Sequence, residues 1–211
     1  MTITPATKLT AIIGQPVTHS MSPVLHNAIY KKEGVDAVML AFGNPSIEKL
    51  VTVIRTLPIR LAPVTMPHKQ TIMPLLDEID GTARDIGAVN TVVDREGKLT
   101  GYNTDVAGIA KALGGVRLKG ANVLLIGAGG AARPVAYHLT RAGAHLFCNN
   151  RDMDQAAELC EKFGGTVLEA HELPNTPFDL IINATPIGMK PNVDAMPVPE
   201  SIIRKGAAAL G

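Results

Sequence analysis

The sequence predicts an α/β protein made of two lobes, and three observations indicate this. Strand-like apolar runs alternate with helical patterns over residues 9–79, which is typical of an α/β layer with a mostly parallel sheet. The same alternation restarts at residue 122, after the glycine-containing segment 114–120. Hydrophobic residues make up 46% of the 211 residues, enough to form a core in each lobe. We therefore expect one domain over residues 1–104 and a second over 105–211.

The first lobe begins with three β-α repeats. Its apolar runs predict strands at residues 9–13, 37–42 and 61–65. Its helical patterns predict helices at residues 23–32, 46–56 and 70–79. A hairpin follows, with strands at 90–93 and 98–102 around the turn Asp94-Arg95-Glu96-Gly97. The next helix opens at Asp105, which can act as its N-cap or as an acid in its first turn.

The second lobe has its own β-α pattern. Strands are predicted at residues 122–126, 145–149, 166–168 and 179–182. Helices are predicted at residues 130–142 and 153–163. The last six residues, 206–211, carry no clear signal.

A glycine-rich turn joins the first strand and helix of this second lobe. Residues 122–137 read NVLLIGAGGAARPVAY, a G-x-G-x-x-[GA] pattern that starts at Gly127 and ends at Ala132. Such a turn lets the backbone approach a pyrophosphate, and the following helix directs its free N–H groups at that charge. A tight turn between two packed elements is the alternative. The strand expected about twenty residues further on favours the first interpretation, so we predict a Rossmann-like dinucleotide-binding domain with a parallel sheet.

Composition excludes several classes of partner. The formal net charge is +1, which gives no electrostatic reason to expect nucleic acid or an anionic membrane. No apolar stretch reaches the length of a membrane span, and the N-terminus does not resemble a signal peptide. Cys148 and Cys160 have no metal-type spacing with the histidines, so reduced, buried thiols are expected. These features predict a soluble, cytoplasmic protein that binds small molecules, with a homodimer left open.

Polar residues of the first lobe gather where strands end. Ser20 and Ser22 lie two residues apart after the first strand and suit a carboxylate or polyol, although Ser22 before Pro23 also fits a helix cap. Lys69 leaves the third strand at the edge where open α/β sheets bind ligands. Asn90 and Asp105 are of types that most often serve as turn and cap residues. Each residue taken alone favours the structural interpretation.

Six motifs taken together resemble the shikimate dehydrogenase family. In chain order they are GQPVTHSMSPVLHN, VTMPHK, GAVNTVV, GYNTD, GAGGAARPV and NATPIGM, and they run from Gly14 to Met189. The resemblance implies a substrate-binding first lobe, a nicotinamide cofactor, and reversible reduction of 3-dehydroshikimate to shikimate on the route to aromatic amino acids.

The resemblance also implies roles for residues of the first lobe. Lys69 and Asp105 would be the catalytic pair at the hydroxyl that becomes the ketone. A lysine has an ordinary pKa of about 10.4 and is a poor base at neutral pH, so it would have to be tuned by its surroundings or coupled to a neighbouring group. Ser20 and Ser22 would hold the substrate carboxylate; quinate-preferring members often have Thr in place of the second serine. Thr65 and Asn90 would bind ring hydroxyls.

Cofactor-binding residues are implied in the second lobe. The turn residues are Gly127, Ala128, Gly129, Gly130 and Ala131. Asn150 and Arg151 match the NADP pattern of the family, whereas Asp152 occupies a position where NADP users commonly have Thr. Asn150 and Arg151 therefore favour NADP, and NAD stays open because an acid beside a phosphate is repulsive. Thr185 would approach the nicotinamide ring.

The chain departs from the family pattern in two places. Pro63 stands where an Asn is usual, and a proline is awkward in a central strand. Family members also continue past the elements found here, with a late helix that packs on the first lobe. Two alternatives therefore stay open: an NAD-dependent quinate/shikimate dehydrogenase, and a catalytically silent dinucleotide-binding fragment.

Overall fold

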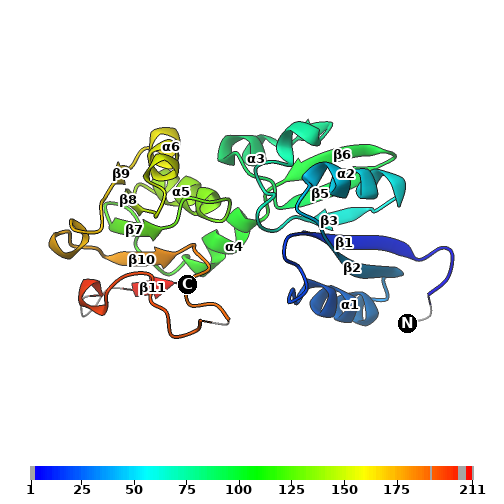
Figure 1. Cartoon of the computed structure of the whole chain (residues 1–211), viewed down its shortest axis with the longest axis horizontal. Helices are drawn as coiled ribbons and strands as arrows, with labels where there is room; N and C mark the ends of the chain where they lie inside the picture. The colour runs from blue at the N-terminus through cyan, green and yellow to red at the C-terminus, as the bar shows by residue number, and fades with distance from the viewer. Residues whose placement is uncertain (1–2, 191, 204–207, 211) are drawn as a thin grey trace. The chain divides into compact units, whose positions relative to one another are not determined.

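The computed structural model describes residues 3–190, 192–203 and 208–210 (Figure 1). The chain divides into two compact units, Met1–Thr104 and Asp105–Gly211. Each unit has its own β-sheet, so the α/β architecture expected from the sequence is confirmed. None of the helices in the described residues combines the length and apolarity that a bilayer crossing requires.

The first unit contains a six-stranded mixed sheet. Its strands are β1 (Lys8–Gly14), β2 (Ala37–Gly43), β3 (Leu61–Pro63), β4 (Glu78–Ile79), β5 (Thr91–Arg95) and β6 (Lys98–Tyr102). Its helices are α1 (Ser22–Glu33), α2 (Ile47–Thr56), α3 (Gly81–Ile86) and the 3-10 turn η1 (Met73–Leu75). The order is β2-β1-β3-β5-β6-β4, and β5 runs antiparallel to both of its neighbours. The carboxyl ends of β1 and β3 therefore lie at one edge of the sheet.

Helix α2 supplies the apolar stripe that covers this sheet. Ile47, Leu50, Val51 and Ile54 are buried, at the spacing of one helical face. They belong to a core cluster with strand residues such as Ile13. The Ser46 side chain accepts a hydrogen bond from Lys49 N at 3.3 Å and caps the helix.

Helix α1 packs mainly on the edge strand β2. The Asn27 side-chain amide donates to Met39 O at 3.0 Å and accepts from Met39 N at 2.8 Å. Three apolar residues of this helix, Val24, Leu25 and Ile29, are exposed.

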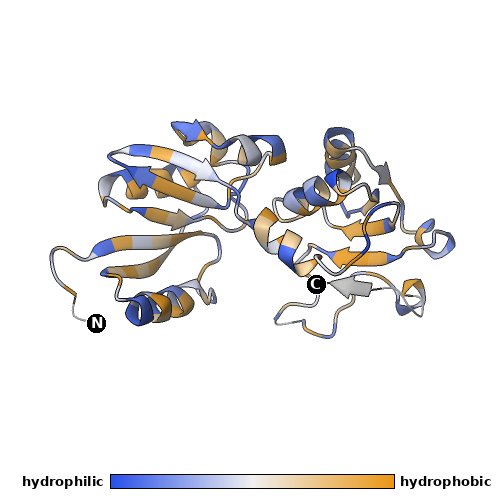
Figure 2. Cartoon of the chain, turned by 180° about the vertical axis from the view of Figure 1, so that it is seen from behind, coloured by the Kyte–Doolittle hydropathy of each residue, from blue (hydrophilic) through white to orange (hydrophobic). Residues whose placement is uncertain are grey.

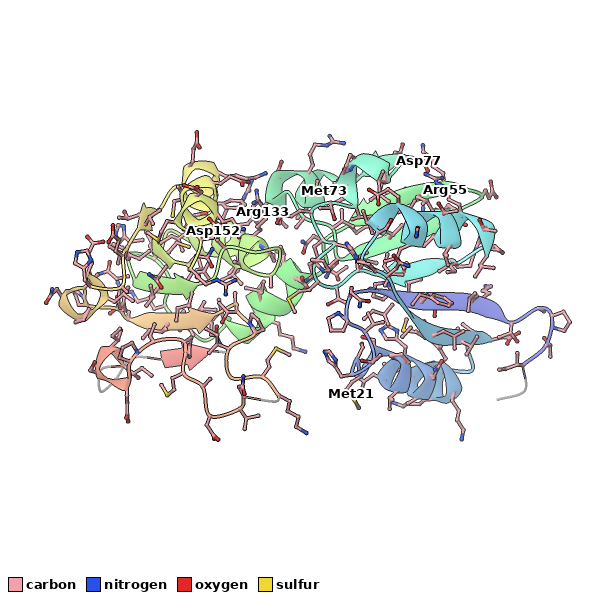
Figure 3. The ribbon with its side chains drawn as sticks, in the orientation of Figure 1. Met21, Arg55, Met73, Asp77, Arg133 and Asp152 are labelled. Atoms are coloured by element: carbon pink, nitrogen blue, oxygen red, sulfur yellow. The ribbon has the colours of Figure 1, made fainter. Side chains whose placement is uncertain are left out.

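An ion pair connects α2 to the segment that precedes the edge strand β4. Arg55 donates from Nη1 and Nη2 to the two carboxylate oxygens of Asp77, at 3.0 and 3.1 Å (Figure 3). Asp77 also accepts from Leu99 N at 2.7 Å, in strand β6. These hydrogen bonds, those from Arg55 first, lower the pKa of Asp77 below its ordinary value.

The predicted helix at 70–79 is wrong. The segment forms turns, the 3-10 turn η1 and strand β4 instead. Pro74 lacks an N–H and disfavours the helical conformation of the residue before it. Glu78 and Ile79 then pair with β6, a tertiary contact that no local pattern announces. Helix α3, after the Asp80 cap, was not predicted.

Two further details of the first unit differ from expectation. Pro63 does lie in a central strand, as the last residue of β3, and the pairing continues beyond it through the hydrogen bond from Val64 N to Asn90 O. Strand β5 extends to Arg95, so the hairpin turn is Glu96-Gly97, with both residues at positive φ.

The second unit contains a five-stranded parallel sheet. Its strands are β7 (Asn122–Ile126), β8 (His145–Asn149), β9 (Thr166–Val167), β10 (Leu180–Asn183) and β11 (Ala208–Leu210). Its helices are α4 (Asp105–Ala112), α5 (Ala132–Arg141), α6 (Met153–Phe163) and the 3-10 turns η2 (Leu173–Asn175) and η3 (Glu200–Ile202). The order β11-β10-β7-β8-β9 places β7 at the centre. The central strands are the most apolar part of this unit (Figure 2).

Both cysteines lie in the core of this unit. Cys148 in β8 and Cys160 in α6 are free and buried, as predicted. Cys148 Sγ donates to Gly127 O at 3.7 Å. The neighbouring Cys160 sulfur and burial raise the pKa of Cys148, so it stays a thiol.

Candidate active site

The glycine turn has the geometry that a dinucleotide pyrophosphate needs. Gly127 has a φ of +105°, and Gly127 N donates to Asn149 O at 2.9 Å, which joins the turn to β8. A Cβ on Gly129 would meet no atom within 4 Å, so a ligand can approach the backbone there. Helix α5 has no side-chain cap at Ala131 and no acid in its first turn. An anion is therefore favoured at this helix N-terminus.

The loop after β8 continues this surface. Asn150 Nδ2 donates to Asp152 O at 2.8 Å and braces the loop. The Asp152 side chain accepts from Gln155 N at 3.2 Å and caps α6 (Figure 3). Arg151 is exposed beside it. The loop thus presents one cation and one carboxylate, and the carboxylate already occupies the end of a helix.

The turn after β10 lies against the glycine turn. A Cβ on Gly127 would stand 2.9 Å from Thr185 Cγ2 and 3.1 Å from Ala184 O. Ala184 N donates to Ile126 O at 2.8 Å, which extends the pairing of β10 with β7. The three predicted cofactor segments therefore follow three neighbouring strands, β8, β7 and β10, at their carboxyl ends.

An ion pair that the sequence analysis missed lies behind this surface. Arg133, in the first turn of α5, is buried and donates from Nη1 to Glu158 Oε1 at 3.1 Å (Figure 3). Its guanidinium carbon lies 5.9 Å from the centre of the Phe163 ring. The pair fastens α5 to α6. A buried arginine cannot be recognised from its one-letter code, so no sequence signal indicated it.

In the first unit, the two serines lie at the start of α1. Ser20 Oγ accepts a hydrogen bond from Ser22 N at 3.3 Å. Ser22 is the first residue of the helix and its N-cap position is Met21, so the interpretation of Ser22 as the cap is wrong. Ser20 fulfils part of the capping role, and neither serine is fully buried.

The segment from Thr65 to Lys69 leaves the end of β3. Thr65 N donates to Ile13 O at 2.9 Å, and a Cβ on Gly14 would overlap the Thr65 methyl group Cγ2. His68 is buried and its Nε2 lies 2.8 Å from Asn44 O. Lys69 O accepts from Val89 N at 2.7 Å. Contacts on both sides thus hold the backbone around the half-buried lysine.

Asn90 is held on every side. Its Oδ1 accepts from Thr104 N at 2.9 Å and from Thr91 Oγ1 at 2.9 Å, and Asn90 O accepts from Val64 N at 2.7 Å. Thr104 directly precedes Asp105, which is the first-turn acid of α4, as expected. The structure thus brings the segments of Thr65, Lys69 and Asn90 together within the first unit, and Asn90 links them to the residue before Asp105.

Comparisons with known proteins give a family match in each of the two units. Residues 12–92 match the family model described as the shikimate dehydrogenase substrate binding domain, and residues 108–190 match shikimate / quinate 5-dehydrogenase. A shikimate dehydrogenase (NADP(+)) of Pyrococcus furiosus is 40% identical over 208 residues, which cover 97% of this chain and 75% of the relative. The chain belongs to the shikimate dehydrogenase family.

Solved members of the shikimate dehydrogenase family have the same fold. The crystal structure of the Aquifex aeolicus shikimate dehydrogenase matches with a TM-score of 0.90 and 36% identity, covering 99% of this chain and 88% of that one. The Thermus thermophilus shikimate 5-dehydrogenase, solved in complex with NADP(H) and shikimate, matches with a TM-score of 0.85 and 34% identity. That match covers 96% of this chain and 77% of the other.

Proposed function

We propose that this chain catalyses the reversible, NADPH-dependent reduction of 3-dehydroshikimate to shikimate in the biosynthesis of chorismate and the aromatic amino acids. The observation that carries the proposal is the 40% identity to an NADP-dependent shikimate dehydrogenase over nearly the whole chain. The motifs that prompted the prediction all lie within that span.

The first unit is proposed to bind the substrate. Ser20 and Ser22 would hold the carboxylate from the start of α1, where backbone N–H groups also favour an anion. Thr65 and Asn90 would bind ring hydroxyls. The hydrogen bonds around Asn90 support this role, because they hold the amide in a fixed orientation before a ligand arrives.

Lys69 and Asp105 are proposed to carry out the proton transfer to and from the substrate oxygen. NADPH supplies the hydride when bound. In the reduction the Lys69 ammonium would donate its proton to the ketone oxygen, and in the oxidation Lys69 would take that proton from the hydroxyl. Asp105 would orient the ammonium and accept a hydrogen bond from the substrate hydroxyl.

The second unit is proposed to bind NADP. The backbone of Gly127, Ala128, Gly129, Gly130 and Ala131 would hold the pyrophosphate. Asn150 and Arg151 would contact the ribose phosphate, with Asp152 opposing its charge. Thr185 would contact the nicotinamide half. NAD is the alternative cofactor, and Asp152 is the residue that favours it.

Oxidation of shikimate and quinate, followed at the absorbance of the reduced nicotinamide, tests the proposal. We expect turnover of shikimate with NADP, and weaker turnover with NAD or quinate. Preference for quinate and NAD would favour the NAD-dependent alternative. Absence of turnover together with cofactor binding would favour a catalytically silent dinucleotide-binding protein, and absence of both would contradict the assignment.

Two substitutions test the assigned roles. Lys69→Ala is expected to lower kcat by about 100-fold or more, the usual range for a lost proton-transfer group, while cofactor binding persists. Arg151→Ala is expected to weaken NADP much more than NAD. Equal losses for the two cofactors would mean that Arg151 does not contact the phosphate.

A homodimer and a cytoplasmic location stay predictions. Sedimentation velocity tests whether the chain forms a homodimer.

A further inference from the structure

The turn that follows β10 is organised by one side chain, that of Asn183. Asn183 Nδ2 donates to Ile187 O at 2.9 Å. Asn183 Oδ1 accepts from Thr185 N at 3.0 Å and from Thr185 Oγ1 at 2.6 Å. One amide thus closes the turn around Thr185, much as an Asx turn does.

These contacts allow a single orientation of the amide. The Thr185 backbone N–H can only donate, and the Ile187 carbonyl can only accept. A flipped amide would place its nitrogen against an N–H and its oxygen against a carbonyl. Because both partners belong to the main chain, the orientation of Asn183 does not depend on any hydroxyl rotor.

The fixed amide in turn determines the polarity of the Thr185 hydroxyl. Its hydrogen points to Asn183 Oδ1, and its oxygen accepts from Ile187 N at 3.2 Å. A hydroxyl has one hydrogen and two acceptor lone pairs. Thr185 Oγ1 therefore meets a ligand as an acceptor, and the group it fits is an N–H or O–H donor.

The strand order indicates which part of a dinucleotide lies there. The glycine turn ends β7, and the loop with Asn150 and Arg151 ends β8 on one side. In a fold of this type the dinucleotide crosses the sheet at the central glycine turn, so its two halves lie on opposite sides. The turn with Thr185 ends β10 on the other side and touches Gly127. The donor that the nicotinamide half carries is the amino group of its carboxamide.

We propose that Thr185 Oγ1 accepts a hydrogen bond from the nicotinamide carboxamide, and that Asn183 is the positioning residue that fixes this polarity. The inference rests on the proposed function and adds to it the recognition of the carboxamide. Asn183 does not touch the cofactor in this scheme. Its effect is transmitted through one hydroxyl group.

Three ligands separate this contact from the rest of the cofactor site. They are NADP⁺, its 3-acetylpyridine analogue, in which an acetyl group replaces the carboxamide, and 2′-phospho-ADP-ribose, which has no nicotinamide. Dissociation constants are measured by titration calorimetry on the full chain. The wild-type protein should bind NADP⁺ about threefold to tenfold more tightly than the acetylpyridine analogue, the value of one neutral hydrogen bond.

Substitutions then assign the preference to the two residues. Asn183→Ala and Thr185→Val should each bring the ratio close to one, while 2′-phospho-ADP-ribose binds within about twofold of wild type, which also shows that the unit is folded. Asn183→Asp keeps an acceptor for the Thr185 hydroxyl and should retain the preference. Asn122→Ala is the control, because it removes the bond from Asn122 Nδ2 to Pro177 O at the opposite end of β7.

Each outcome decides a different point. Binding of 2′-phospho-ADP-ribose without any preference for the carboxamide would overturn the inference and leave the proposed function intact. An Asn183→Ala protein with the full wild-type ratio would overturn the positioning role. Failure of the wild-type protein to bind 2′-phospho-ADP-ribose would overturn the proposed function, and the inference with it.

Discussion

Replacement of Gly14 by alanine should weaken substrate binding, although residue 14 is not proposed to contact the substrate. Gly14 ends β1, and a Cβ there would overlap Thr65 Cγ2 and stand 2.8 Å from Met66 O. Both contacts are closer than a real Cβ allows, so Thr65 must move, and so must either the Met66 carbonyl, which is held by the bond from Gln15 N at 2.8 Å, or the backbone of Gly14 itself. Overpacking of this kind costs about 1–3 kcal/mol.

The magnitude can be checked in two assays. A loss of about 1–3 kcal/mol should lower the melting temperature of the first unit by roughly 4–24 °C, at about 4–8 °C per kcal/mol for a unit of this size. A displaced Thr65 should raise KM for shikimate severalfold and leave KM for NADP unchanged. Kinetics measured below the melting transition of both proteins keep the two effects apart.

Gly81→Ala is the matched control for Gly14→Ala. Gly81 begins α3 in the same unit, and a Cβ there meets nothing within 4 Å. Its stability should stay within about 0.5 kcal/mol of wild type. A Gly14→Ala protein with unchanged melting temperature would refute the packing argument, and a lower melting temperature with unchanged KM would refute the link from Gly14 through Thr65 to the substrate.

Three further predictions follow from the contacts described above. Asp77→Asn should lower the free energy of unfolding by only about 0.5–1 kcal/mol at pH 7, because the pair with Arg55 is partly exposed. Since the pKa of Asp77 is lowered in the folded state, the difference from wild type in urea-unfolding curves should disappear as the pH falls below about 4. A difference that does not change with pH would exclude the charge of Asp77 as its cause. Asp152→Thr should lower KM for NADP by about threefold to tenfold and leave KM for NAD nearly unchanged, because it removes a carboxylate that repels the phosphate and keeps a cap for α6. An equal change in KM for the two cofactors would show that the phosphate lies elsewhere. Gly127→Ala should destabilise the second unit by about 1–3 kcal/mol, because the added Cβ would be too close to Thr185 and Ala184. Gly129→Ala should keep the wild-type melting temperature and lose NADP binding in calorimetry. The opposite pattern would contradict the assignment of the open space at Gly129 to the pyrophosphate.

Elements with strong local signals could be predicted from the sequence. Helix α6 and strands β7 and β8 have the predicted limits, because Asp152 caps the helix and Gly164 ends it, and because the strands are short apolar runs bounded by turns. The helix prediction for residues 70–79 failed because local signals do not determine the structure of this segment. Its β4 residues pair with β6, and its Asp77 is held by Arg55 from another helix, so its structure is decided by distant partners.

The candidate site shows the same division. Motif residues such as Lys69 were selected from the sequence because six motifs, in their order and spacing, together resemble one family. The roles of the residues that hold them were not predicted. Asn183 lies in the motif NATPIGM, but only its hydrogen bonds to Thr185 and Ile187 show what it does. Gly14 has no side chain to suggest a role, and its importance depends on where Thr65 lies.

The bonds between Asn27 and β2 have a consequence for the protein in solution. An edge strand offers unpaired backbone groups to which another chain can add, and this is a common route to aggregation. At Met39, in the middle of β2, a side-chain amide occupies both the N–H and the carbonyl. An incoming strand would have to break these two bonds before it could pair there. The side chain of a neighbouring helix thus protects the middle of the apolar run Ala37–Phe42 against strand addition.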